Sequence, residues 1–172
     1  MNRALAACLV LAALPSGAYA GDLFSSIDAV QNELKAPDAA RRRDAVDKLD
    51  AFSADDARAL LLGALGDSDA DVRAHAALSL GKHRIGDAVP RLTAALGDPD
   101  LKLRAAAAEA LGLVLQGPGA NDPTKDAVRA AETLERALGD GEHEVREAEI
   151  GAIGKLPPTL SRRTAVALTG RL

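Results

Sequence analysis

Three histidines and many carboxylates are the residues of this chain that could do chemistry. Imidazole and carboxylate groups bind transition metals when several of them converge on one point. Among His75, His83 and His143, only His143 is followed by a glutamate. The chain has a single cysteine, and it has neither a Gly-x-Ser-x-Gly motif nor a phosphate-binding glycine loop. We therefore predict no metal site, no cofactor and no catalytic residue.

The composition indicates an all-α protein. Of the 172 residues, 48% are hydrophobic and only 2% are aromatic, so small side chains fill the apolar positions, which favours closely packed helices over sheets. A formal net charge of -4 offers no electrostatic footprint for nucleic acid. We predict no nucleic-acid partner.

The first twenty residues have the layout of a secretory signal peptide. Arg3 precedes an apolar run over residues 4–14, and residues 18–20 read Ala-Tyr-Ala. The apolar run is shorter than the roughly 20 residues that span a bilayer. We predict cleavage after Ala20, export to the periplasm or out of the cell, and no membrane span. Cys8 ends a lipobox-like sequence, but most of the apolar core follows it, so a lipid anchor at Cys8 is disfavoured.

An internal repeat determines the predicted fold. Residues 66–73, 97–104 and 139–146 align, each segment running from Gly-Asp to Arg, and each arginine is followed by glycine eight residues later. A fainter copy begins at Pro37. Because such repeats bury their apolar faces against each other, we expect a repeat domain over residues 37–172, preceded by a capping helix over residues 21–36. The expected units are 37–65, 66–96, 97–138 and 139–172.

Each unit is predicted to contain two helices. In the first helix, Val72, Ala76, Ala77 and Leu80 share one face. Aspartates at the starts of the repeats are expected N-caps, Pro99 is expected at a first helical position, and glycines after Leu80 and Leu111 are expected to end the helices in a left-handed conformation. The expected caps are Asp67, Asp98 and Asp140, and the expected terminators are Gly81 and Gly112.

The second helices are expected near residues 53–65, 87–96, 122–138 and 161–172. Their predicted core positions are leucines that pair at a spacing of four residues. The pairs are Leu61 with Leu65, Leu92 with Leu96, and Leu134 with Leu138.

The pattern Asp-x-Asp-x-x-Val-Arg followed by Ala-Ala-x-x-Leu-Gly resembles HEAT repeats, especially the phycobilisome-lyase-like class. This resemblance implies an α-solenoid of about four helix pairs, used as a scaffold or binding module. It also implies a structural ladder in which arginines pair with aspartates of neighbouring turns. The ladder residues are Asp67, Arg73, Asp98, Arg104, Asp140 and Arg146.

Two features depart from the period. Glu149 stands where the earlier units have Ala76 and Ala107, which puts the packing of the fourth unit in question. The third unit is longer than the second, and the excess surrounds Gly117–Thr124. Insertions in such repeats map to one face, often the binding face, although this segment could equally be a plain linker.

The resemblance implies that the second helices line the concave side, where arginines could make bidentate contacts to partner carboxylates. The predicted partner-binding residues are Arg58, Arg91, Arg129, Glu132 and Arg136. We therefore predict an exported, non-catalytic module that binds a polypeptide partner along the solenoid.

Two alternatives stay open. Deoxyhypusine hydroxylase resembles this chain in its repeats and implies a di-iron oxidoreductase, but its His-Glu pairs begin two residues after the valine of Val-Arg, where this chain reads Ala74-His75 and Glu147-Ala148. The other alternative is structural self-association through Leu168 and Leu172 of the C-terminal helix. Bilin lyases, which attach tetrapyrroles, are disfavoured by the few aromatic residues.

Overall fold

The structure of the protein is a computed structural model that describes residues 26–116, 125–138 and 140–160. Every regular element in these ranges is helical. The α-helices are α1 (Ile27–Glu33), α2 (Ala39–Lys48), α3 (Ala54–Ala64), α4 (Ala70–Lys82), α5 (Val89–Ala95), α6 (Leu101–Val114), α7 (Lys125–Ala137) and α8 (His143–Gly154). Two short 3₁₀ turns, η1 (Leu49–Ala51) and η2 (Gly86–Ala88), follow α2 and precede α5.

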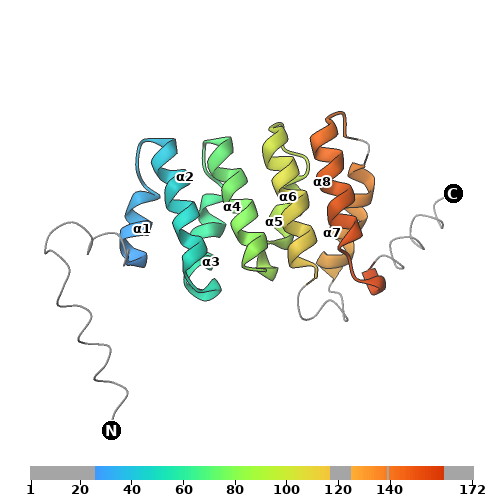
Figure 1. Cartoon of the computed structure of the whole chain (residues 1–172), viewed down its shortest axis with the longest axis horizontal. Coiled ribbons are helices and arrows are strands. Elements are labelled where there is room, and N and C mark those ends of the chain that lie inside the picture. The colour runs from blue at the N-terminus through green and yellow to red at the C-terminus, as the bar shows by residue number, and fades with distance from the viewer. Residues whose placement is uncertain (1–25, 117–124, 139, 161–172) are drawn as a thin grey trace, which may run out of the picture.

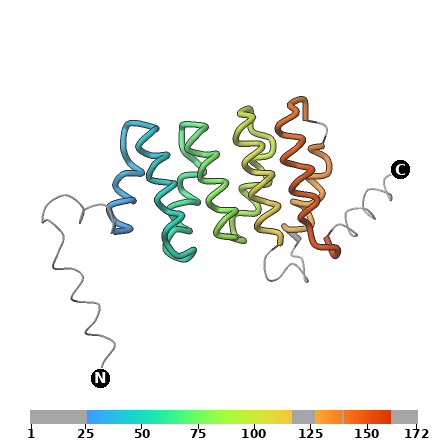
Figure 2. The backbone as a smooth tube through the Cα atoms, viewed as in Figure 1, coloured from blue at the N-terminus to red at the C-terminus, as the bar shows by residue number. Residues whose placement is uncertain are grey.

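The helices form two rows, as an α-solenoid does. Figure 1 shows α2, α4, α6 and α8 side by side in one row, with α3, α5 and α7 behind them. The tube in Figure 2 shows the colours advancing steadily from blue to red along this row, because each unit stacks on the one before it. The predicted all-α solenoid of stacked helix pairs is confirmed.

The core contains the predicted apolar face of the first helices. Val72, Ala76, Ala77 and Leu80 are completely buried. The second helices bury Leu61, Leu92 and Leu134 completely, and they bury Leu65 and Leu96 almost completely. Leu138 was wrongly predicted as a core residue, since it lies beyond the last residue of α7 and is 39% exposed.

Two glycines expected to end helices lie inside them instead. Gly81 lies within α4 and Gly112 within α6, and both are buried. A Cβ atom added at Gly81 would lie 2.7 Å from Cα of Ala110, and one added at Gly112 would lie 2.8 Å from Cα of Ala152. The glycines therefore let neighbouring first helices approach closely. The left-handed residue after α4 is Arg84, with a φ of 52°.

The predicted N-caps are displaced by two residues. Asp38, Asp69 and Asp100 cap the first helices of units 1 to 3, and their carboxylates accept hydrogen bonds from backbone N–H groups of the first turn. In the fourth unit the cap position is Glu142. Asp67, Asp98 and Asp140 precede these caps, and each of them pairs instead with an arginine of the preceding unit. Pro99 likewise lies before the cap and outside α6.

Part of the predicted N-terminal capping helix is present as α1. Ser26 caps it, Val30 is buried, and Ile27 and Leu34 pack against the core. In the part of the chain described, no helix is long and apolar enough to cross a membrane. The predicted signal peptide, the segment 117–124 and the predicted helix 161–172 lie outside the described residues.

Candidate functional site

A ladder of arginine–aspartate pairs joins consecutive units along one edge of the solenoid. Nε of Arg42 lies 2.7 Å from Oδ2 of Asp67, and Nε of Arg104 lies 2.8 Å from Oδ2 of Asp140. The middle pair is longer, with Nη2 of Arg73 3.5 Å from Oδ1 of Asp98. The ladder implied by the resemblance thus includes Arg42 as well, which the prediction omitted.

Each ladder arginine also fixes the turn before its own helix. Nη1 of Arg73 donates to the carbonyl oxygens of Asp67 and Ser68, at 3.0 and 3.1 Å. Nη1 of Arg146 does the same for Asp140 and Gly141, at 2.7 and 3.0 Å. One guanidinium therefore holds its own turn, and in the first three units it also holds the carboxylate of the next unit.

The ladder changes the acidity of its members. The hydrogen bond from Arg42 lowers the pKa of Asp67 below its usual value. The pKa of Asp140 is lowered mainly by the backbone N–H of Glu142 and then by Arg104. These carboxylates are thus stabilised in their charged form, which suits a structural ion pair.

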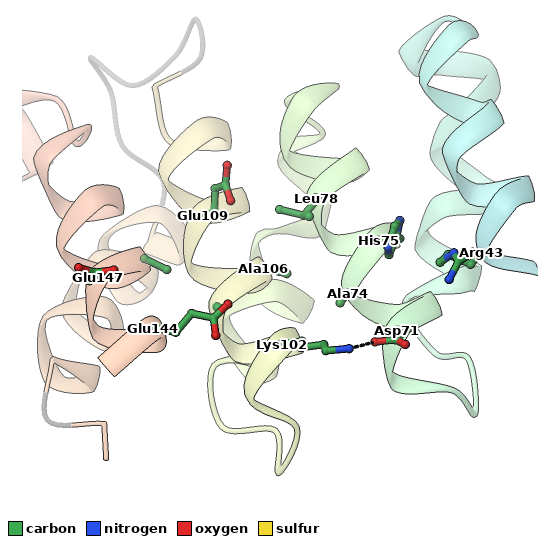
Figure 3. Close-up of a pocket in the computed structure, with 12 residues that line it drawn as sticks. Arg43, Asp71, Ala74, His75, Leu78, Lys102, Ala106, Glu109, Glu144 and Glu147 are labelled. Carbon is green, nitrogen blue, oxygen red and sulfur yellow. Dashed lines mark hydrogen bonds and ion pairs between the residues drawn. The ribbon is translucent and has the colours of Figure 1, made fainter. Parts of the chain in front are cut away.

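A groove of about 570 Å³ runs across the exposed face of the first-helix row, from α2 to α8. Its floor is made of small or apolar side chains, and charged side chains stand along its walls (Figure 3). The floor residues are Ala74, Leu78, Ala105, Ala106 and Ala148. The charged and titratable lining residues are Arg43, Asp71, His75, Lys102, Glu109, Glu144 and Glu147.

The sequence prediction missed this groove, although the repeat held a signal for it. The lining residues occupy the same few positions of successive units, and these positions differ between copies, whereas the core positions stay apolar except at Glu149. One such position reads Asp71, Lys102 and Glu144, and another reads Leu78 and Glu109. Residue types at such outer-face positions can change without disturbing the core, so these positions can be adapted to a binding partner.

The charges of the groove are unevenly compensated. Nζ of Lys102 lies 2.7 Å from Oδ1 of Asp71, as the dashed line in Figure 3 shows, and Nδ1 of His75 lies 2.7 Å from Oδ1 of Asp47. The hydrogen bond from Lys102 lowers the pKa of Asp71. At the α6–α8 end, Glu109 and Glu144 are exposed, and Oε1 of Glu147 lies 3.7 Å from Nε2 of His143.

The predicted partner-binding residues lie in the other row of helices. Arg58 on α3 is paired with Asp87, and Nη1 of Arg91 on α5 donates to the carbonyl oxygen of Leu62 at 2.7 Å. Arg91 also lines a smaller hollow of about 390 Å³ beside the Arg73–Asp98 pair.

The remaining predicted residues are on α7. Arg129 and Arg136 are exposed and Glu132 is half-buried; Nε of Arg136 donates to the carbonyl oxygen of Glu132 at 3.1 Å. None of the five predicted residues lines the groove across the first-helix row, and their role in binding stays a prediction.

The histidines do not converge. His75 contacts Asp47, Nε2 of His83 lies 3.2 Å from the carbonyl oxygen of Leu49, and His143 lies beside Glu147. Within residues 26–116, 125–138 and 140–160, no group of three or more His, Cys, Asp or Glu side chains is arranged to hold a metal ion.

Glu149 is buried in the fourth unit, where the other units carry alanine. Its exposed fraction is 0%, and neither carboxylate oxygen has a hydrogen-bond partner in the described part of the chain. Burial, with a smaller effect of the Asp140 charge, raises its pKa to about 7, although Arg104 and Arg146 oppose the shift. At neutral pH, Glu149 is thus close to half protonated.

Comparisons with known proteins agree with this architecture. Two solved structures match 84% of the chain with a TM-score of 0.63 each: an engineered protein (20% identity, 68% of that chain covered) and the complex of CpcE and CpcF of phycocyanin lyase from Nostoc sp. PCC7120 (21% identity, 86% covered). At these identities, the likeness shows the fold alone. No significant match was found among curated proteins. The family model for HEAT repeats matches residues 27–112 and 70–154, and the chain therefore belongs to the HEAT repeat family.

Proposed function

We propose that this protein is a non-catalytic scaffold that docks a polypeptide segment in the groove across α2, α4, α6 and α8. HEAT repeats suggest a role in protein interaction. The observation that carries the proposal is the groove itself, which has an apolar floor and charged walls. Small floor side chains such as Ala105 and Ala106 leave room for the side chains of a partner, and the walls can orient it by hydrogen bonds and ion pairs.

This proposal moves the docking surface from the second helices to the first. Two of the predicted arginines already have contacts within the chain, since Arg58 pairs with Asp87 and Arg91 reaches the carbonyl oxygen of Leu62. A partner would have to compete with these contacts. A partner that docks on the floor of the groove would not have to break contacts of this kind.

The test is affinity capture of the partner from an extract of the native cells, using a variant whose groove is filled. Ala105→Trp places an indole on the floor, and the matched control Ala59→Trp adds the same group to the exposed surface of α3. We expect Ala105→Trp to lose the captured partner and Ala59→Trp to retain it. Equal capture by wild type and Ala105→Trp would refute docking of the partner in the groove.

The alternative surface is tested by the same assay. A triple variant with alanine at Arg58, Arg91 and Arg129 removes the cations of the second-helix row. If this variant loses the partner while Ala105→Trp keeps it, the partner binds the second helices.

We further propose that the protein is exported. The support is the sequence alone: Arg3, the apolar run of residues 4–14 and the Ala-Tyr-Ala before the expected cleavage point. Intact-mass analysis of the protein from native cells tests this proposal. Loss of the first 20 residues is the expected result, and a full-length protein in the cytoplasm would contradict it.

A further inference from the structure

We infer that the segment docked in the groove is cationic, and that its lysine or arginine side chains face the α6–α8 end. This inference rests on the proposed function and adds the chemistry and the orientation of the partner. It follows from the way charge is distributed along the groove, as Figure 3 shows, with His75 and Arg43 at one end and Glu109, Glu144 and Glu147 at the other.

At the α2–α4 end of the groove, the charged side chains already have partners within the chain. Asp71 is bound by Lys102, and Asp47 by His75. Nη2 of Arg43 lies 3.1 Å from Oδ1 of Asp44, so this cation has a partner too. A docked segment gains little from placing charge at this end, because each new ion pair would displace an existing one.

The opposite end keeps an excess of negative charge. Glu109 comes from α6, while Glu144 and Glu147 come from the first two turns of α8. Within the described ranges, no lysine or arginine pairs with these three carboxylates, and Glu147 contacts only the imidazole of His143, at 3.7 Å on two exposed side chains. All three carboxylates line the same end of the groove, so their negative charges add there and favour a cationic side chain at that end.

The floor between these carboxylates suits the stems of lysine and arginine. Ala105, Ala106 and Ala148 are small and apolar, so a methylene chain can lie across them while its charged head reaches the wall. An aspartate or glutamate of a partner would face the same three carboxylates and be repelled. The groove therefore favours partner segments that carry positive charge at the α6–α8 end and that fit the shape of its floor.

The test uses three fluorescein-labelled synthetic peptides that share one alanine–leucine frame and differ at four positions, which are all lysine, all glutamine or all glutamate. Binding to the full chain is measured by fluorescence anisotropy at low salt. We expect the lysine peptide to bind about tenfold more tightly than the glutamine peptide, and the glutamate peptide to bind most weakly. Added salt should reduce the advantage of the lysine peptide.

Two triple variants identify the surface. In the first, Glu109, Glu144 and Glu147 are changed to glutamine, and the lysine peptide should bind about tenfold more weakly. In the second, Asp28→Asn, Asp55→Asn and Glu142→Gln change the net charge by the same amount at exposed positions outside the groove lining, and binding should be unchanged.

The possible results separate this inference from the proposed function. If the glutamine peptide binds as tightly as the lysine peptide and Ala105→Trp abolishes both, the groove docks peptides but the inference is wrong. If both triple variants weaken the lysine peptide equally, the attraction is a general effect of net charge, and the inference is again wrong. If the lysine peptide fails to bind, the inference is overturned whether or not Ala105→Trp loses its native partner.

Discussion

Glu149 should make the stability of the fourth unit depend on pH. Its carboxylate is buried without a hydrogen-bond partner in the described part of the chain, and its pKa rises from 4.5 to about 7. A difference of one pKa unit corresponds to about 1.4 kcal/mol, so full ionisation of Glu149 costs the folded state about 3 kcal/mol. That is a large fraction of the stability of a small domain.

The direction follows from proton binding. Between pH 4.5 and 7, the folded state holds a proton on Glu149 that the unfolded state has released. The stability associated with protonated Glu149 is therefore complete below pH 4.5 and is lost as the pH rises through about 7. Asp67 and Asp140 act in the opposite direction, because their lowered pKa values make stability fall at acidic pH.

The assay is urea denaturation of wild type and Glu149→Gln at several pH values between 5 and 8.5. Subtracting one curve from the other cancels the contributions of the other carboxylates. We expect Glu149→Gln to gain about 2.5 kcal/mol relative to wild type between pH 5 and 8.5, while Glu147→Gln, at an exposed position on the same helix, gains almost nothing. A difference between wild type and Glu149→Gln that stays constant with pH would refute the burial argument.

Three further predictions concern the stacking of the units, and each is measured by urea denaturation. Gly81→Ala should destabilise the protein by about 1 to 3 kcal/mol because its Cβ would meet Cα of Ala110, whereas Gly63→Ala, at an open helical position, should stabilise it by about 0.5 to 1 kcal/mol; two changes of the same sign would contradict the close approach. Leu111→Ala should cost roughly 2 to 5 kcal/mol since the side chain is fully buried, and a neutral result would disprove its core position. Arg104→Ala should cost about 2 kcal/mol by breaking one rung of the ladder, and a loss below about 0.5 kcal/mol would show that the rung does not hold the units together.

The architecture was predictable because the apolar positions repeat with a fixed phase. Val72, Ala76 and Leu80 fall on one helical face in the sequence and are buried together in the structure. A repeated pattern of this kind leaves few alternatives, because a single helix pair cannot bury its apolar stripe alone.

The roles of some aspartates and glycines could not be predicted, because they depend on contacts with the neighbouring unit. The second and third units each have two aspartates, such as Asp67 and Asp69, that both suit an N-cap, and only the position of Arg42 shows that Asp67 belongs to the ladder. Gly81 suits a helix end as well as a close helix contact, and the difference depends on the distance to Ala110. The Arg42–Asp67 contact and the Gly81–Ala110 approach both join neighbouring units, so the sequence around one residue does not reveal them.

The groove was missed for another reason. The resemblance implies binding by the second helices, and polar positions on the outer face of the first helices are equally typical of a solvated surface. His75 and Leu78 differ in type from their counterparts Ala106 and Glu109. Only the packing of α4 beside α6 shows that these positions line one groove.

The ladder also bears on how such a chain can change its length. Every joint of the ladder uses the same chemistry, since an arginine of one unit meets the aspartate that opens the next. Excising residues 67–97 would join Gly66 to Asp98, and that aspartate would then stand opposite Arg42. Genetic duplication or loss of whole units can thus lengthen or shorten the array while every joint is kept, and the span offered to a partner becomes adjustable in steps of one unit.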